Sequence, residues 1–185
     1  MKMQARDIPN LISILRMLIT IPVVWMLLLE QYGIALVLFA VAGFSDGLDG
    51  FLAKSYGWES RMGGILDPLA DKILLVSCFF ALGWLELVPY WLVVVVFFRD
   101  LLIAAGCTAY HFQVSRLDAV PSLASKLNTL VQIMLVLLVV LDQVFAVLPS
   151  GLLVGLIWIT FTTTIFSGVG YAWVWSRRVA INSAI

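Results

Sequence analysis

Residues 46–54 read Asp-Gly-Leu-Asp-Gly-Phe-Leu-Ala-Lys, and residues 63–71 read Gly-Gly-Ile-Leu-Asp-Pro-Leu-Ala-Asp. Together they bring four carboxylates into a chain that is otherwise rich in apolar residues: Asp46, Asp49, Asp67 and Asp71. On insertion scales, one carboxylate at the centre of a bilayer costs about 2.5–3.5 kcal/mol. Because four such residues are not explained by packing, the two segments predict a site that binds metal cations and carries out chemistry at a membrane.

The composition around these segments predicts an integral membrane protein. Of the 185 residues, 63% are hydrophobic and 12% are charged, whereas a soluble domain carries roughly 25% charged residues. A membrane-spanning helix needs about 20 residues, and six apolar runs approach or exceed that length: 10–30, 33–54, 64–85, 89–110, 123–144 and 151–175. A signal peptide would explain the first run alone, so the sequence predicts one all-helical domain over residues 1–185 with six transmembrane helices.

The placement of charge predicts the orientation of these helices. Six spans put both termini on one side, and that side holds seven basic residues: Lys2, Arg6, Lys54, Arg61, Arg116, Arg177 and Arg178. The opposite short loops hold Glu30, Glu86 and Asp142 and no basic residue. The positive-inside rule therefore predicts cytoplasmic termini and a multi-pass protein of the inner, cytoplasmic membrane. With 11 basic and 11 acidic residues, the net charge gives no reason to expect a nucleic-acid partner.

The spacing of the four carboxylates predicts two helix-face pairs. Asp46 and Asp49 are three residues apart, and Asp67 and Asp71 are four apart, so each pair lies on one face of a helix. A short connection predicts that the two helices are antiparallel neighbours and that the carboxylates converge near the cytoplasmic interface. Like charges at one place repel unless they are protonated or bind cations. Oxygen ligands suit Mg²⁺, Mn²⁺ or Ca²⁺, and Mg²⁺ is commonly shared with substrate phosphates.

The glycines of the two segments favour the same interpretation. Gly47, Gly50, Gly63 and Gly64 lack side chains, which lets a second backbone or a diphosphate approach closely. Lys54, one turn beyond Gly50, is placed to meet a phosphate oxygen. The alternative is a glycine-packed helix pair in which the Asp residues cap helices or pair with Lys72. Cys78 and Cys107 lack metal-ligand spacing and are predicted to be small buried hydrophobic residues.

The pattern Asp46-x2-Asp49-Gly50-x2-Ala53-Lys54-x8-Gly63-x3-Asp67-x3-Asp71 resembles the signature of the CDP-alcohol phosphatidyltransferase family. Seven of the eight defining positions match, and the departure is Lys54, where the family normally has Arg. Lysine keeps the charge but loses the bidentate fork of arginine, which leaves open how Lys54 contacts phosphate. The resemblance extends to the six spans and to the N-terminal Pro-Asn-Leu-Ile-Ser-x2-Arg.

The resemblance implies transfer of a phosphatidyl group from CDP-diacylglycerol to an alcohol, with release of CMP. It assigns one or two Mg²⁺ or Mn²⁺ ions to Asp46, Asp49 and Asp67, with Asp71 also near the metal, and it makes Asp71 the general base. It places the CDP-lipid against seven residues: Asn10, Ser13, Arg16, Gly50, Ala53, Lys54 and Gly63. For Asn10 and Arg16 the alternatives are a helix N-cap and a snorkelling side chain. The resemblance also implies a homodimer.

The acceptor alcohol is the least determined part of the prediction. Arg99, Arg116 and Lys126 are candidates for binding an anionic acceptor; a structural ion pair between Arg99 and Asp100, and membrane orientation by the other two residues, are the alternatives. Ser125-Lys-Leu-Asn-Thr129, with Asn128 where glycerophosphate-type members tend to have Lys, is more similar to the cardiolipin synthases of this superfamily. This favours phosphatidylglycerol as acceptor and keeps sn-glycerol 3-phosphate as the alternative.

Two other classes of function compete with a transferase. An ion transporter would also use acidic residues within spans, but here the carboxylates are predicted near one membrane face rather than at mid-bilayer. A catalytically inactive scaffold is disfavoured by the four intact carboxylates.

Overall fold

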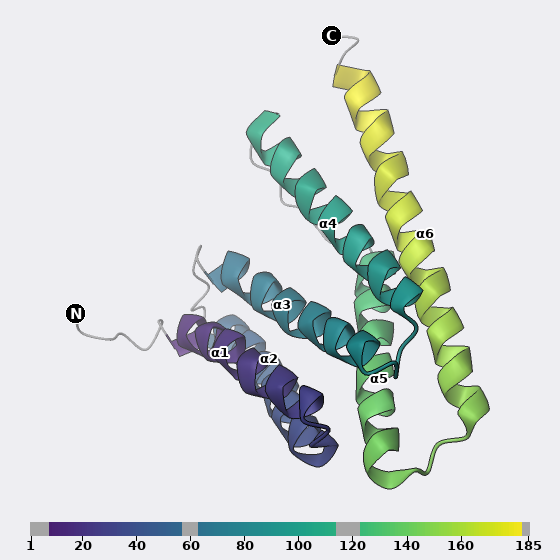
Figure 1. Cartoon of the computed structure of the whole chain (residues 1–185). Coiled ribbons are helices and arrows are strands. Elements are labelled where there is room, and N and C mark those ends of the chain that lie inside the picture. Colours follow the sequence, from purple (N-terminus) through teal and green to yellow (C-terminus); the bar gives the residue numbers. More distant parts are fainter. Residues whose placement is uncertain (1–7, 57–62, 114–122, 183–185) are drawn as a thin grey trace. The chain divides into compact units, whose positions relative to one another are not determined.

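The computed structural model describes residues 8–56, 63–113 and 123–182, with side chains described for 11–45, 69–105, 123–149 and 151–171. The described chain is all-helical (Figure 1). Six helices follow one another: α1 (Ile8–Leu28), α2 (Tyr32–Tyr56), α3 (Gly63–Trp84), α4 (Tyr90–Gln113), α5 (Leu123–Phe145) and α6 (Ser150–Asn182). Six helices confirm the predicted all-α class, and their bounds differ from the expected runs mainly in α6, which continues beyond residue 175.

Three helices end in the same way, with a residue in the left-handed region of backbone conformation. Glu30, Glu86 and Ala146 have φ values of 57°, 60° and 49°. After α1, the amide of Gln31 donates to the carbonyl of Met26, and after α3 the amide of Leu87 donates to the carbonyl of Leu82. These are the six-to-one hydrogen bonds of a Schellman cap. In such a cap, the residue with positive φ is usually glycine. The caps make the α1–α2 and α3–α4 connections short.

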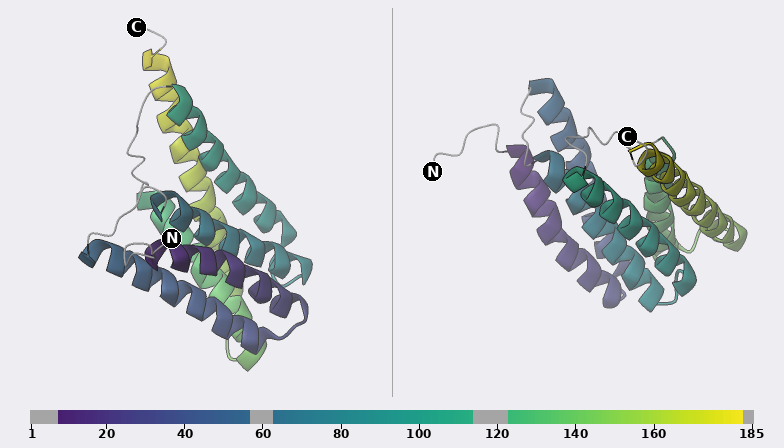
Figure 2. Two further views of the ribbon diagram at one scale, coloured as in Figure 1. Left: turned by 90° about the vertical axis from the view of Figure 1, so that its left-hand side faces the viewer. Right: turned by 90° about the horizontal axis from the view of Figure 1, so that it is seen from above.

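The chain divides into two compact units, of which the first comprises Met1–Leu87 and Val136–Val147. In this unit α1 packs against both α2 and α3; α2 runs antiparallel to α1, and α3 runs in the same direction as α1 (Figures 1 and 2). α2 and α3 run in opposite directions, as predicted (Figure 1), and whether they pack against each other near residues 46–68 stays a prediction.

The core of the first unit is apolar at the ends of α1 and α3 that lie away from Asp71. Val23, Leu27, Cys78 and Phe79 are almost fully buried there. A small cavity is lined by side chains of this core and by Val140 of α5. The burial of Cys78 confirms its predicted role as a small hydrophobic residue.

The second unit comprises Val88–Leu135 and Leu148–Ile185. In it, α4 packs against α6, and the two run in the same direction (Figures 1 and 2). Trp91 of α4 meets Trp158 and Phe161 of α6, with ring centroids 5.8 and 5.3 Å away. The first half of α5 belongs to this unit and supplies polar side chains that contact α4 and α6.

The surface of the helices is apolar, as expected where a helix faces lipid. Ile21, Trp25, Val37, Phe98 and Phe166 are all more than half exposed. Within the described residues, three helical segments are long and apolar enough to cross a membrane: Leu11–Leu28, Leu123–Phe145 and Gly151–Tyr171. Large exposed apolar surfaces are rare on soluble monomers, so these features are those of a membrane protein.

Candidate functional site

Asp71, the predicted general base, forms an ion pair with Arg16. Asp71 lies in the third turn of α3, and one of its carboxylate oxygens accepts a hydrogen bond from Nη1 of Arg16 on α1. The two side chains differ sharply in exposure: 1% for Arg16 and 43% for Asp71. A buried guanidinium therefore holds a partly exposed carboxylate, and this fixes the orientation of that carboxylate.

The buried face of α1 explains why Arg16 lies there. The buried residues of α1 follow each other at intervals of three and four: Ser13, Arg16, Thr20, Val23 and Leu27. This is the spacing of one helix face. The face is polar in the first half of the helix and apolar in the second, and the Thr20 hydroxyl donates to the Arg16 carbonyl at 3.0 Å. Arg16 thus does not snorkel to a surface; it extends into the interior of the first unit.

The other members of the predicted metal and CDP-lipid site are only partly described. Asp46 and Asp49 lie on α2, and Asp67 lies on α3, so both carboxylate pairs are on helices as predicted. Their side chains are not among those described, and neither are the side chains of Asn10, Ala53 and Lys54 or the surroundings of Gly50 and Gly63. The convergence of four carboxylates stays a prediction. Ser13, the remaining predicted lipid contact, is fully buried on the same face of α1 as Arg16.

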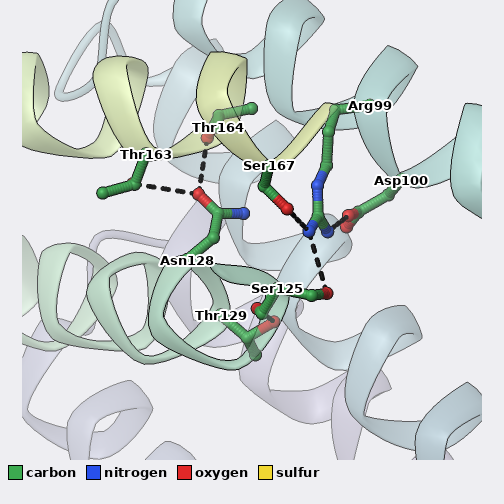
Figure 3. Close-up of polar contacts among 8 residues, drawn as sticks. All are labelled: Arg99, Asp100, Ser125, Asn128, Thr129, Thr163, Thr164 and Ser167. Carbon is green, nitrogen blue, oxygen red and sulfur yellow. Dashed lines mark hydrogen bonds and ion pairs between the residues drawn. The ribbon is translucent and has the colours of Figure 1, made fainter. Parts of the chain in front are cut away.

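Arg99 is the centre of a second polar cluster, in the second unit. Its Nη1 donates to Asp100 at 2.6 Å, and its Nη2 donates to the hydroxyls of Ser125, at 2.9 Å, and Ser167 (Figure 3). Arg99 is 5% exposed. These four residues, the Arg99 cluster, join α4, α5 and α6. The Arg99–Asp100 ion pair weighed from the sequence is therefore present, and the buried charge is neutralised within its own unit.

Next to this cluster, Asn128 binds two threonines of α6. The hydroxyls of Thr163 and Thr164 lie 3.0 and 2.9 Å from Oδ1 of Asn128 and donate to it, while its amide nitrogen is turned away from them (Figure 3). Asn128 and Thr164 are both fully buried. Asn128, the residue that favoured phosphatidylglycerol as acceptor, is thus a neutral side chain whose hydrogen-bond partners are neutral hydroxyls.

The three predicted acceptor residues have different surroundings. Arg99 is buried in its cluster, Lys126 is exposed on α5, and Arg116 lies outside the described residues. The sequence interpretation missed Ser167 and Gln132, which are also buried. The sequence does contain a signal for both residues, namely polar side chains on one face of an apolar helix. Gln132 is four residues after Asn128, and Ser167 ends the series Thr160, Thr164, Ser167, with intervals of four and three.

The donor set of the predicted metal site fits a hard divalent cation. The four aspartates offer only carboxylate oxygens, the ligands that Mg²⁺ and Mn²⁺ prefer. Within the residues whose side chains are described, no group of three or more His, Cys, Asp or Glu could hold a metal, because Asp71 is the one site carboxylate among them. The Asp71 side chain is 43% exposed, so it lies where a metal or a substrate hydroxyl can reach it.

Comparison with known proteins shows the family to which this chain belongs. The family model described as CDP-alcohol phosphatidyltransferase matches residues 6–166. Relatives include the rice chloroplastic CDP-diacylglycerol–glycerol-3-phosphate 3-phosphatidyltransferase 1 (37% identical, covering 89% of this chain and 56% of the relative). Human cardiolipin synthase (CMP-forming) is 32% identical, and the match covers 89% of this chain and 60% of the human protein.

A third relative carries the other activity name. A probable phosphatidylglycerophosphate synthase of Mycobacterium tuberculosis is 34% identical over 68% of this chain and 62% of its own. The chain thus spans between about half and three fifths of the length of these curated relatives. The match covers α1 to α5, the aspartate-bearing segments and the threonines of α6, and the chain belongs to the CDP-alcohol phosphatidyltransferase family.

Proposed function

We propose that this protein transfers the phosphatidyl group of CDP-diacylglycerol to an alcohol acceptor and releases CMP, in the synthesis of anionic phospholipids. The observation that carries the proposal is the family match over residues 6–166, which includes every aspartate of the motif. The relatives named above act, by their names, in the synthesis of phosphatidylglycerophosphate or cardiolipin. The conserved chemistry of both is attack of a hydroxyl on a diphosphate-linked lipid.

Asp71 is the general base of the proposed reaction. One oxygen of its carboxylate accepts the proton of the acceptor hydroxyl, whose oxygen forms a bond to the phosphorus that bears diacylglycerol. The diphosphate bond to CMP breaks, and CMP leaves with the bridging oxygen. Arg16 holds the carboxylate in place, so the base is oriented before the acceptor arrives. This arrangement reduces the reorganisation needed at the moment of reaction.

Asp46, Asp49 and Asp67, with Asp71 beside them, would hold one or two Mg²⁺ or Mn²⁺ ions. The bound cation would neutralise the charge that develops on the diphosphate leaving group. Ser13 and Arg16 supply buried polar groups on the face of α1 where the CDP head group is proposed to bind, together with Asn10, Gly50, Ala53, Lys54 and Gly63. Arg99, Arg116 and Lys126 are the proposed acceptor residues.

The proposed setting is the inner, cytoplasmic membrane, with six spans, both termini in the cytoplasm and residues 1–185 forming one transferase domain. The buried polar residues of α1 and α5 support this topology. Arg16 and Asn128 both lie in the half of their helix that the positive-inside rule assigns to the cytoplasm. A homodimer is part of the proposal because the family resemblance implies it.

Phosphatidylglycerol is the favoured acceptor, and sn-glycerol 3-phosphate is the alternative. A phosphomonoester carries up to two charges, whereas a phosphodiester carries one. Asn128 is buried and bound by the neutral hydroxyls of Thr163 and Thr164, so this position adds no cation for a second charge. The relatives divide between the two activities by name, which keeps both acceptors in the test.

The test uses the purified full chain with CDP-diacylglycerol and Mg²⁺ or Mn²⁺, offered each acceptor separately, with CMP release and lipid mass measured. Asp71→Asn is expected to lower CMP release by about 10³-fold, within the range for a general base. Asp142→Asn, on α5 outside the motif, is the matched control and should retain turnover. Unchanged turnover in the Asp71 variant would remove the base assignment. Product with glycerol 3-phosphate alone would reverse the acceptor preference.

A further inference from the structure

Two buried carboxamides on α5 leave polar atoms without partners. Asn128 and Gln132 are both fully buried and lie one helical turn apart in the second unit. Among the residues that the structure describes, Nδ2 of Asn128 and both Oε1 and Nε2 of Gln132 have no hydrogen-bond partner. We call these two residues the amide pair. Buried polar groups are nearly always hydrogen-bonded, so three unmatched atoms on adjacent turns call for a partner.

The neighbours of Asn128 orient its amide rather than satisfy it. The Thr164 hydroxyl donates to Oδ1, which turns the carbonyl side toward α6. The single proton of the Thr163 hydroxyl is shared between Oδ1, at 3.0 Å, and the Thr160 carbonyl oxygen, at 3.1 Å. The two N–H groups of Nδ2 therefore face away from the threonines (Figure 3). An apolar residue of the same size would fill this position without the desolvation cost. A donor that is held in one orientation and has no partner in the protein is placed to bind a ligand.

The chemistry of the amide pair defines what it binds. Nδ2 of Asn128 offers only donors, while Gln132 offers donors on Nε2 and an acceptor on Oε1. Neither residue is charged, and the nearby cation of Arg99 is already paired with Asp100. A bare anion or a metal ion would leave part of this set unmatched. A pair of adjacent hydroxyls matches it, because each hydroxyl both accepts and donates one hydrogen bond.

From this we infer that the amide pair binds the vicinal diol of the glycerol group in the acceptor. This inference rests on the proposed function and names the acceptor chemistry that both candidate acceptors share. Phosphatidylglycerol and sn-glycerol 3-phosphate each end in a glycerol with two neighbouring free hydroxyls. The amide pair then selects glycerol by its hydroxyls rather than by its phosphate.

The test compares acceptors that differ by one hydroxyl. Phosphatidylglycerol is paired with its 1,3-propanediol analogue, and sn-glycerol 3-phosphate with 3-hydroxypropyl phosphate; each analogue keeps the terminal hydroxyl and lacks its neighbour. Sites that hydrogen-bond a substrate hydroxyl reject analogues without it. The wild-type chain is expected to favour the diol by about 100-fold in kcat/KM with at least one of the two acceptor pairs.

The variants are chosen to remove the amides while keeping side-chain size. Asn128→Leu and Gln132→Met are expected to reduce the diol preference to about threefold, mainly by raising KM for the diol. Gln143→Met on the same helix, where Gln143 is exposed, is the matched control and should keep the full preference. Two separate variants guard against loss of folding, which is checked by monodispersity in size-exclusion chromatography, and either folded variant decides the question.

The outcomes separate the diol site from the proposed function. If the folded variants lose turnover on diol and analogue equally, the amides have a structural role or hold an ordered water, and the diol site is overturned. A wild-type chain that transfers to both acceptors of a pair without preference overturns it too. A wild-type chain that releases no CMP with any acceptor overturns the proposed function itself, and the diol site with it.

Discussion

The Arg99 cluster makes a quantitative prediction about stability. Replacing Asp100 by Asn leaves the buried Arg99 guanidinium with hydrogen bonds to Ser125 and Ser167 but without its counter-charge. Breaking a buried ion pair by removing one partner costs about 3–5 kcal/mol. Because two hydroxyls still accept hydrogen bonds from Arg99 and Asn keeps one carbonyl oxygen, we use the lower end of this range. We expect Asp100→Asn to lower the free energy of unfolding by about 3 kcal/mol.

A double-mutant cycle separates the ion pair from the packing around it. Arg99→Met removes the cation and should cost about 3 kcal/mol, since Asp100 loses its ion-pair partner Arg99. The double variant Arg99→Met/Asp100→Asn contains no buried charge in the pair, so we expect it to cost about 2 kcal/mol, less than either single variant. The two residues would then be coupled by about 4 kcal/mol.

The assay is unfolding of the purified chain in mixed micelles, titrated with sodium dodecyl sulfate and followed by the fluorescence of its seven tryptophans. Lys126→Met is the matched control, because it removes an exposed cation and should change stability by less than about 0.5 kcal/mol. A coupling below about 0.6 kcal/mol, the average for hydrogen bonds between membrane helices, would refute the reasoning that Arg99 and Asp100 form an energetic unit.

Three further predictions follow from the helix ends, the Asn128 contacts and the metal site. Glu30→Gly and Glu86→Gly should each raise the unfolding free energy by about 1 kcal/mol, since glycine adopts positive φ without strain; a decrease in the same titration would contradict this. Thr164→Val should cost about 1 kcal/mol, because it removes a donor to buried Asn128, whereas Thr162→Val on the exposed face should cost less than half of that. EDTA should abolish CMP release and added Mg²⁺ or Mn²⁺ should restore it; activity that survives chelation would exclude the metal-dependent reaction.

The aspartate motif and the apolar runs were readable from the sequence for local physical reasons. A carboxylate in an apolar helix is costly enough that its spacing carries information, and the spacings of three and four required helices at Asp46–Asp49 and Asp67–Asp71. The structure has helices at both places, and the family match covers them. The burial of Cys78 was predictable in the same way, because an isolated cysteine in an apolar run has no polar alternative.

The sequence alone therefore predicted the helical class and the family, which the structure and the family match confirm. It also predicted the reactive carboxylates, because all three depend on residue type and on spacing along one helix. Tertiary structure decided which helix faces meet. It packed α1 against α3 in the described residues, buried Arg16 as the partner of Asp71, and brought Ser125 and Ser167 to Arg99. Contacts between residues 26 to 68 positions apart depend on packing across helices, and no periodicity within a single helix encodes them.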